Sequence, residues 1–257
     1  MNNILHCGQH GFRTRHSCET ALHELLTAVN NNKDKRLITL LLFIDFRKAF
    51  DLVDSKKLLR KLFHYGFDDK SLNLIADYFT NRFQAVKYKN EMSTPLNIKL
   101  SVPQGSVLGP LFFILFINDL AFLLEFGIIM FADNTTLYDA DADLDLLLCK
   151  FSKKLEPLLD WCKFNKLDLN WSKTYFMFIT SQRVKLPIEI LVSGLLVKVV
   201  NTFKLLGITI DNKLNFEKYS KDLKLIINRK LYSIKRLVYL SAKVKIQFFR
   251  QGNSKNS

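Results

Sequence analysis

The sequence has few of the residues that build disulfide frameworks and zinc sites. Its four cysteines show no C-x-x-C spacing and have no paired histidines nearby; they are Cys7, Cys18, Cys149 and Cys162. This usage predicts reduced thiols in an intracellular protein of the nucleus or cytoplasm, without structural zinc. The opening residues MNNILHCGQHG lack a basic flank followed by an apolar run, so we expect no targeting signal.

Long uninterrupted apolar runs are absent as well. The most apolar passage, residues 107–132, is broken by Asn118, Asp119 and Glu125. Each of its runs is shorter than the ~20 residues that cross a bilayer, so a buried helix and a buried strand explain it better than a membrane span. No repeat or Pro/Gly-rich linker divides the 257 residues. We therefore expect one large or two small folded domains and no membrane partner.

Acidic residues are outnumbered, at 24 against 38 basic residues, which gives a net charge of +14. This balance favours a polyanionic partner such as nucleic acid, with an anionic membrane surface or a solubility surplus as alternatives. Residues 213–250 alone carry eleven basic and two acidic residues, a net charge of +9. Apolar residues recur there every three or four positions, from Leu223 to Val238. The pattern predicts an amphipathic helix that contacts phosphates, rather than an ordinary solvated face.

Hydrophobic periodicity predicts the secondary structure of the first third of the chain. Ser17 can cap a helix with its apolar positions on one face, and NNNKDK (30–35) then reads as a polar loop. Residues 37–46, LITLLLFIDF, form the pattern of a strand buried on both sides. A helix that ends at Gly66 and another over 71–79 follow.

The later elements are predicted in the same way. Alternating apolar residues over 94–102 indicate a half-buried strand, and a helix over 107–124 follows it. We expect a hairpin with Asp133–Asn134 at its tip, and then a helix over 143–165 that Pro157 kinks or breaks. Several strands are expected between 174 and 210, with a turn at Ser193–Gly194. Mixed elements without strict alternation predict an α+β domain followed by a small helical one.

Two aspartates follow passages that are otherwise apolar. Asp45 ends a nearly unbroken apolar run, and Asp133 lies in the sequence FADN. A bare carboxylate in such a place needs a cation, a cap or water. Simpler explanations exist for each, a strand-end cap for Asp45 and a tight turn for Asp133.

The two aspartates lie 88 positions apart, and they would converge if their strands were neighbours in one sheet. Converging carboxylates at strand ends form a site for hard divalent cations such as Mg²⁺. A metal pair is the usual arrangement for displacing one phosphate ester by another. In a basic chain, such a site would indicate a nucleic-acid polymerase or nuclease.

Six short stretches in a fixed order identify a family. They are QHGFR (9–13), FIDFRKAFD (43–51), SVPQGSVLGPLFFILFIND (101–119), FADN (131–134), LDLNWSKTYFMFI (167–179) and FKLLGITID (203–211). Together they resemble the reverse transcriptase (RNA-directed DNA polymerase) of non-LTR retrotransposons of the long interspersed element type. The resemblance covers about 9–250, and KAFD and PQGSVLGP are its most specific parts.

The resemblance implies a right-hand polymerase palm, an antiparallel sheet packed on helices. It divides the chain into a remnant of the fingers over 1–36, the palm over 37–212, the start of a basic helical thumb over 213–250 and a polar tail over 251–257. It also implies an RNA template, a DNA primer and deoxynucleoside triphosphates as partners. The oligomeric state stays open.

By the same resemblance, Asp45 and Asp133 match the two metal-binding aspartates, with Mg²⁺ as the cofactor and Mn²⁺ as an alternative. Lys173 matches a lysine near the leaving pyrophosphate, where a cation or general acid stabilises developing charge. On its own, Lys173 would be taken for a surface lysine.

The remaining matches concern the nucleotide and the primer. Phe50 matches the steric gate that leaves no room for a 2′-hydroxyl, although an ordinary core phenylalanine is the simpler explanation. Gln104 and Gly105 match the loop along the templating base pair, where glycine lets the backbone approach. Leu206 and Gly207 lie in the turn that resembles the primer grip.

Three departures from the family pattern predict reduced or lost activity. The family carries FADD where this chain has Asn134, which keeps an oxygen ligand but loses a charge; some RNA-virus palm polymerases have Asp-Asn here and work. Only eight residues precede QHGFR, which leaves Arg13 and Arg15 from the basic fingers. The pattern stops at the thumb-like helix, without endonuclease, zinc-knuckle or RNase H segments, as in a truncated copy. The alternatives are a non-enzymatic, basic nucleic-acid-binding remnant and a fragment without a biochemical role.

Overall fold

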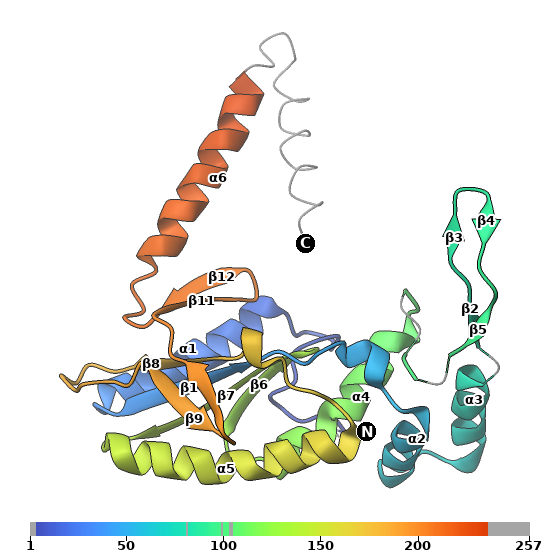
Figure 1. Cartoon of the computed structure of the whole chain (residues 1–257). Coiled ribbons are helices and arrows are strands. Elements are labelled where there is room, and N and C mark those ends of the chain that lie inside the picture. Colours follow the sequence, from blue (N-terminus) through green and yellow to red (C-terminus); the bar gives the residue numbers. More distant parts are fainter. Residues whose placement is uncertain (1–3, 81, 99, 103–104, 236–257) are drawn as a thin grey trace. The chain divides into compact units, whose positions relative to one another are not determined.

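The computed structural model of the chain describes residues 4–80, 82–98, 100–102 and 105–235 (Figure 1). The chain divides into two compact units, Met1–Asn201 and Thr202–Ser257. The larger unit contains a four-stranded sheet and five α-helices, and the smaller unit contains a two-stranded hairpin followed by one helix in its described part. None of the helices in the described part is long and apolar enough to cross a membrane.

The central sheet has the strand order β6-β7-β1-β8, and every neighbouring pair is antiparallel. Its strands are β1 (Ile38–Ile44), β6 (Gly127–Phe131), β7 (Asn134–Asp141) and β8 (Tyr175–Ile179). All seven residues of β1 are buried, which confirms the strand predicted over 37–46. A strand in the interior of a sheet with both faces covered needs such a continuous apolar run.

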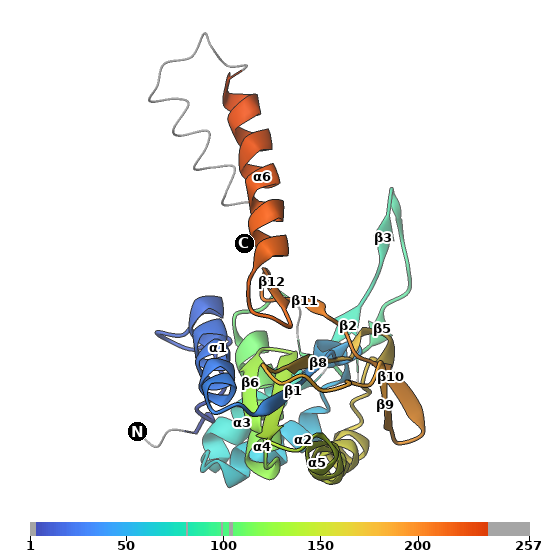
Figure 2. The ribbon, with the colours of Figure 1, turned by 90° about the vertical axis from the view of Figure 1, so that its left-hand side faces the viewer.

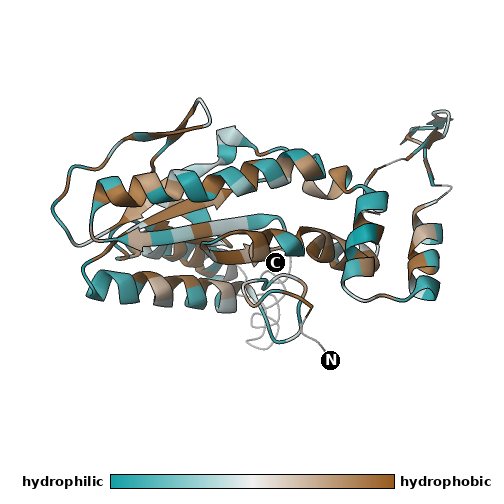
Figure 3. Cartoon of the chain, turned by 90° about the horizontal axis from the view of Figure 1, so that it is seen from below, coloured by the Kyte–Doolittle hydropathy of each residue, from teal (hydrophilic) through white to brown (hydrophobic). Residues whose placement is uncertain are grey.

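Helices cover both faces of this sheet (Figures 1 and 2). On one face lie α4 (Leu108–Leu123) and α5 (Leu144–Asn165), and on the other lies α1 (Cys18–Asp34). Seen from the side of α5, Figure 3 shows hydrophilic and hydrophobic residues alternating along this helix, as expected of a helix with one buried face. The α4 helix is instead buried on most sides, because it lies between the sheet and other helices.

The main core follows from the alternation along β1. The main hydrophobic cluster takes every second residue of the strand, Ile38, Leu40, Leu42 and Ile44. The intervening Leu41 and Phe43 are buried on the opposite face, where α1 packs against β1 and β6. Ser17 caps α1, as predicted, since its hydroxyl accepts a hydrogen bond from the Thr20 amide.

Short pairings protect both edges of the sheet. At the β6 edge, the His10 amide donates to the Met130 carbonyl at 2.8 Å, and the Met130 amide donates to the Gly8 carbonyl at 2.8 Å. At the β8 edge, Val199 pairs with Phe176 in a single parallel bridge. These pairings use backbone groups that an open edge would leave available to other strands.

A projecting arm leads from the helical layer. It follows α2 (Ser55–His64) and α3 (Asp69–Phe79) and consists of four two-residue strands. These are β2 (Phe83–Gln84), β3 (Lys87–Tyr88), β4 (Glu91–Met92) and β5 (Leu96–Asn97), paired as β2-β5 and β3-β4. The predicted half-buried strand over 94–102 is therefore wrong. Leu96 is 71% exposed, because its short strand pairs only with β2, and burial begins again at Val102.

Three other expectations need correction. Most of the predicted loop NNNKDK is helical, because α1 continues to Asp34. Pro157 was predicted to kink or break its helix; the break does not occur, since α5 runs through that residue, and the kink stays a prediction. The predicted tip Asp133–Asn134 is shifted by one residue: the hairpin turn is Ala132–Asp133, so Asn134 belongs to β7, where it pairs with Phe131.

The predicted turn at Ser193–Gly194 is confirmed; it joins β9 (Glu189–Val192) to β10 (Leu195–Lys198).

The smaller unit consists of β11 (Thr202–Leu205), β12 (Ile208–Asp211) and α6 (Glu217–Lys235). The predicted basic helix is confirmed over the bounds of α6, and residues 236–250 lie outside the described residues. Its apolar stripe is largely exposed, at 39% for Leu223 and 46% for Leu231. The carboxylate of Asp211 accepts hydrogen bonds from three backbone amides, those of Lys213 (3.0 Å), Asn215 (3.1 Å) and Phe216 (2.6 Å).

Replacement of Asp211 by alanine is expected to loosen the connection between β12 and α6. Three amides would lose their acceptor, and a typical hydrogen bond makes a net contribution of about 0.5–1.5 kcal/mol to the free energy of unfolding. Hydrogen exchange of residues 213–216 should accelerate by about 10-fold or more. Asp211→Asn retains an acceptor oxygen and should produce a smaller effect. Equal exchange in Asp211→Ala and the unmodified chain would contradict the structural role of this carboxylate.

Candidate active site

The structure brings the two predicted carboxylates to the same end of the sheet. Asp45 directly follows β1, and Asp133 lies in the turn between β6 and β7. The neighbouring strands β1 and β7 pair up to Ile44 and Thr135, one residue short of this turn. Burial raises the pKa of the Asp133 carboxyl above its ordinary value, and the negative charge of Asp45 raises it further. The two carboxylates are therefore close enough to repel each other.

Asp45 is held by a segment that follows α5 in the chain. The Asn170 side-chain amide donates to Asp45 Oδ2 at 2.9 Å, and the Asn170 backbone amide donates to the Asp45 carbonyl at 2.8 Å. Phe46 forms a bridge with Leu169 beside it. Sequence reasoning assigned no role to Asn170. The signal that could have identified it is the LDLN stretch, a polar residue placed after an apolar alternation.

Lys173 also lies beside Asp45. It ends the 3₁₀ helix Trp171–Lys173, and its Nζ lies 3.8 Å from Asp45 Oδ2. The lysine side chain is 69% exposed, so this ion pair contributes little to stability. Its position matters more for chemistry, because it places a mobile cation beside one of the two carboxylates.

Phe50 lies in the 3₁₀ helix Ala49–Leu52 that follows Asp45. Its ring stacks on Phe113 of α4, with 4.2 Å between the centroids and 26° between the planes. Its carbonyl accepts a hydrogen bond from the Val102 amide at 3.0 Å. The ring is partly buried against the core, so a packing role and a gate role are both compatible with its position.

The remaining predicted residues are placed less completely. Gly105 is exposed and has a φ of +79°, a backbone conformation that residues other than glycine rarely adopt. Gln104 lies outside the described residues. Leu206 and Gly207 belong to the smaller unit and form the turn between β11 and β12, with φ values of +46° and +90°. Leucine is uncommon in this left-handed region, and the turn is therefore strained.

The donor set at the end of the sheet suits a hard divalent cation. It consists of the two carboxylates of Asp45 and Asp133 and the exposed amide side chain of Asn134. All are oxygen donors of the kind that Mg²⁺ and Mn²⁺ prefer. A cation would offset both the burial and the smaller repulsion from Asp45 that raise the pKa of Asp133. Within the described ranges, no group of three or more His, Cys, Asp or Glu side chains could hold a metal ion. Asn134 offers an amide oxygen at this end of the sheet and no carboxylate.

Comparison with known proteins decides the family. Residues 1–210 match the family model of the reverse transcriptase (RNA-dependent DNA polymerase). The chain belongs to the reverse transcriptase family. It is 30% identical over 235 residues to a probable RNA-directed DNA polymerase from transposon BS of Drosophila melanogaster, an alignment that covers 85% of this chain and 25% of that protein. This reverse transcriptase chain thus spans about a quarter of the length of the curated relatives it matches.

Solved structures support the same fold. The reverse transcriptase chain is similar to apo telomerase from Candida tropicalis, with a TM-score of 0.54 and 15% identity over 82% of this chain and 36% of that one. It is equally similar to telomerase from the same organism in complex with the TWJ fragment of telomeric RNA, with a TM-score of 0.54 and 13% identity over 85% and 35% of the two chains. The predicted α+β polymerase palm, an antiparallel sheet packed on helices, is confirmed. The division into fingers, palm, thumb and tail stays a prediction.

The raised pKa of Asp133 leads to a prediction about stability. The folded reverse transcriptase chain binds this proton more tightly than the unfolded chain does, so the contribution of Asp133 to stability falls as the pH rises from about 3.8 through the raised value. Asp133→Asn should therefore raise the thermal unfolding midpoint at pH 7 without divalent cations. This gain should shrink as the pH falls towards 4.

The matched control is Asp160→Asn, because the Asp160 side chain is 77% exposed and should leave the midpoint unchanged. Both variants would be followed by circular dichroism from pH 4 to pH 8, with and without Mg²⁺. An Asp133→Asn midpoint that is lower than that of the unmodified chain at pH 7 would refute the unfavourable role assigned to this carboxylate.

Proposed function

We propose that this chain is the catalytic domain of an RNA-directed DNA polymerase of a non-LTR retrotransposon, with activity reduced by Asn134. It would add deoxynucleotides to a DNA primer along an RNA template by nucleotidyl transfer. The observation that carries the proposal is the proximity of Asp45 and Asp133 at the end of neighbouring strands in a reverse transcriptase palm. The names of the transposon relatives support the same reaction.

In this proposal, Asp45 and Asp133 hold Mg²⁺, or Mn²⁺ in its place. When bound there, the ions would supply charge neutralisation and activation of the primer hydroxyl, as in other phosphoryl transfers. Asn170 orients the Asp45 carboxylate through its 2.9 Å hydrogen bond. Lys173, with its Nζ 3.8 Å from Asp45, stabilises the negative charge that develops on the leaving pyrophosphate.

Five further residues have roles in binding the substrates. Phe50 excludes the 2′-hydroxyl of ribonucleotides, and its stack on Phe113 fixes the ring. Gln104 and Gly105 lie along the templating base pair. The strained turn at Leu206 and Gly207 contacts the primer.

The test is primer extension on an RNA template with deoxynucleotides and Mg²⁺ or Mn²⁺. The full chain should extend the primer, and Asp45→Ala should reduce extension to background. Asp160→Asn serves as the matched control, since it removes an exposed carboxylate from another surface. If neither the unmodified chain nor Asn134→Asp incorporates nucleotides above the Asp45→Ala level, the enzymatic function is refuted.

A second candidate function is non-enzymatic binding of nucleic acid. The observation that favours it is the basic surface of α6, where Lys218, Lys221 and Lys224 are exposed. Because these lysines would neutralise phosphates, the affinity would fall steeply with salt concentration and would not depend on the nucleotide sequence. Fluorescence anisotropy with a single-stranded oligonucleotide should show this dependence. Replacement of the three lysines by glutamine should reduce the slope of the logarithm of the affinity against the logarithm of the salt concentration. An unchanged slope would exclude α6 as the binding surface.

A further inference from the structure

The loop Gly8–Gly11 lies against β6 and against the turn that carries Asp133. A Cβ atom on Gly8 would lie 2.3 Å from the Ile128 carbonyl oxygen. A Cβ atom on Gly11 would lie 2.4 Å from the Ala132 amide nitrogen. Both distances are shorter than real Cβ contacts, so the loop touches the hairpin backbone at positions where only glycine fits.

The contact of Gly11 falls on the residue that precedes Asp133. Ala132 has a φ of +56°, so the turn already has an uncommon backbone conformation. A strained two-residue turn keeps its geometry only where its surroundings determine it. The backbone of Gly11 is one element of these surroundings, since it lies against the Ala132 amide.

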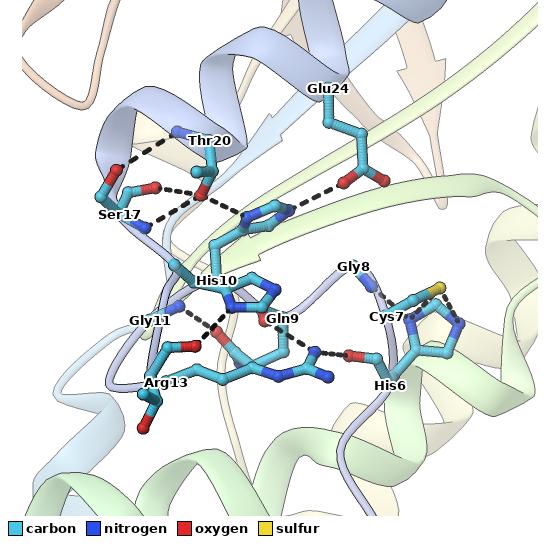
Figure 4. Close-up of polar contacts among 12 residues, drawn as sticks. His6, Cys7, Gly8, Gln9, His10, Gly11, Arg13, Ser17, Thr20 and Glu24 are labelled. Carbon is cyan, nitrogen blue, oxygen red and sulfur yellow. Dashed lines mark hydrogen bonds and ion pairs between the residues drawn. The ribbon is translucent and has the colours of Figure 1, made fainter. Parts of the chain in front are cut away.

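Several contacts hold the loop rigidly in this place (Figure 4). The Gln9 side chain is fully buried, and its Oε1 accepts a hydrogen bond from the Gly11 amide at 2.8 Å. Arg13 donates to the carbonyls of His6 (3.1 Å) and Gln9 (3.4 Å). Arg13 is therefore engaged within the loop, which limits the part it can take in gripping a triphosphate.

His10 ties the same loop to α1. Its ring nitrogens lie 2.9 Å from Thr20 Oγ1 and 3.0 Å from Glu24 Oε2, and the ring is 3% exposed. The loop is thus fixed on one side to a helix and on the other side to β6. The loop can therefore limit the positions that the Ala132–Asp133 turn adopts.

We propose that Gln9 and Gly11 are positioning residues that set the geometry of the Ala132–Asp133 turn and thereby the metal affinity of the Asp45–Asp133 site. This inference rests on the proposed function. Gly11 acts through its backbone contact with Ala132, and Gln9 acts by holding the Gly11 amide. Neither residue touches a reacting group.

A simple structural role for the loop would be support of the β6 edge. Gly127 separates this role from positioning, because it lies at the other end of the same strand. A Cβ atom on Gly127 would lie 2.2 Å from the Tyr138 ring, far along β6 from Asp133. Gly127→Ala is therefore a matched variant that strains the same hairpin without disturbing the turn.

The test measures Mn²⁺ binding by the full chain, with free Mn²⁺ followed by electron paramagnetic resonance. Binding that disappears in Asp45→Ala defines the site. Gly11→Ala should weaken this binding by about tenfold or more, since small displacements of positioned ligands have large effects. Gly127→Ala should lower the thermal unfolding midpoint and change the Mn²⁺ affinity by less than about twofold.

Gln9→Met provides a second variant in case Gly11→Ala does not fold, which the absence of a cooperative unfolding transition would show. Methionine has a similar length and removes the acceptor of the Gly11 amide, so Mn²⁺ binding should again weaken. Equal affinities in the unmodified chain, Gly11→Ala and Gln9→Met would overturn the positioning role alone. The same holds if Gly127→Ala weakens binding as much as Gly11→Ala. No Asp45-dependent binding in the unmodified chain would overturn the proposed metal site together with the positioning role.

Discussion

Replacement of Asn134 by aspartate is expected to increase the rate of nucleotide incorporation by about 10²–10³-fold. Asn134 begins β7 directly after Asp133, and its side chain is exposed at the end of the sheet where Asp45 also lies. An added carboxylate contributes a few kcal/mol of interaction with divalent cations, and each ~1.4 kcal/mol corresponds to a tenfold change in rate. Single-nucleotide primer extension with saturating Mg²⁺ measures the ratio of the two rates.

The control for this gain is Asn134→Ala, which removes the amide oxygen and should be slower than the unmodified chain. In the absence of metal, the added charge of Asn134→Asp should lower the thermal unfolding midpoint, because it joins two carboxylates that already repel each other. Mg²⁺ should then raise the midpoint more in Asn134→Asp than in the unmodified chain. Equal incorporation by Asn134→Asp and the unmodified chain would show that the amide replaces the carboxylate fully.

Replacement of Phe50 by valine is expected to increase the use of ribonucleotides relative to deoxynucleotides by about tenfold or more. The stack on Phe113 holds the Phe50 ring in one orientation, so the smaller side chain removes a fixed obstacle. The measurement is the ratio of kcat/KM for a ribonucleotide and the matching deoxynucleotide in single-nucleotide extension. The Asn134→Asp background provides a faster reaction in which to measure it.

Phe112→Val is the matched control for Phe50→Val. Phe112 lies beside Phe113 in α4 and packs against Tyr78 and Phe79, so its replacement removes an aromatic ring from the same core. Both variants should lower the free energy of unfolding, since each leaves a cavity. An unchanged sugar preference in Phe50→Val would assign this phenylalanine to the core alone.

The sequence predicted the elements that have a strong period or a clear boundary. The buried β1 and the capped α1 were found because one carries a continuous apolar run and the other begins at Ser17. Asp45 and Asp133 could be paired in advance only through the family motifs, because spacing alone does not say which strands are neighbours. Their proximity became a physical observation through the register of β1 and β7.

Other features have no local signal. The alternation over 94–102 is as strong as that of a half-buried strand, yet its pairing with β2 leaves Leu96 exposed on an arm. The contact of Gly11 with Ala132 joins segments about 120 residues apart, and a glycine in a short loop is normally explained by its turn. The hydrogen bond from Asn170 to Asp45 likewise depends on tertiary structure.

The pairing of Gly8–His10 with β6 has a consequence for the order of events during synthesis. Residues Gly8–His10 pair with residues that are synthesised about 120 positions later in the chain. At ~5–20 residues per second, that delay is roughly 6–24 seconds. The β1 strand and α1 can associate in the meantime, whereas the Ala132–Asp133 turn can contact Gly11 only after β6 has been synthesised. The end of the sheet that carries Asp45 and Asp133 therefore becomes fixed later than the packing of α1 on β1.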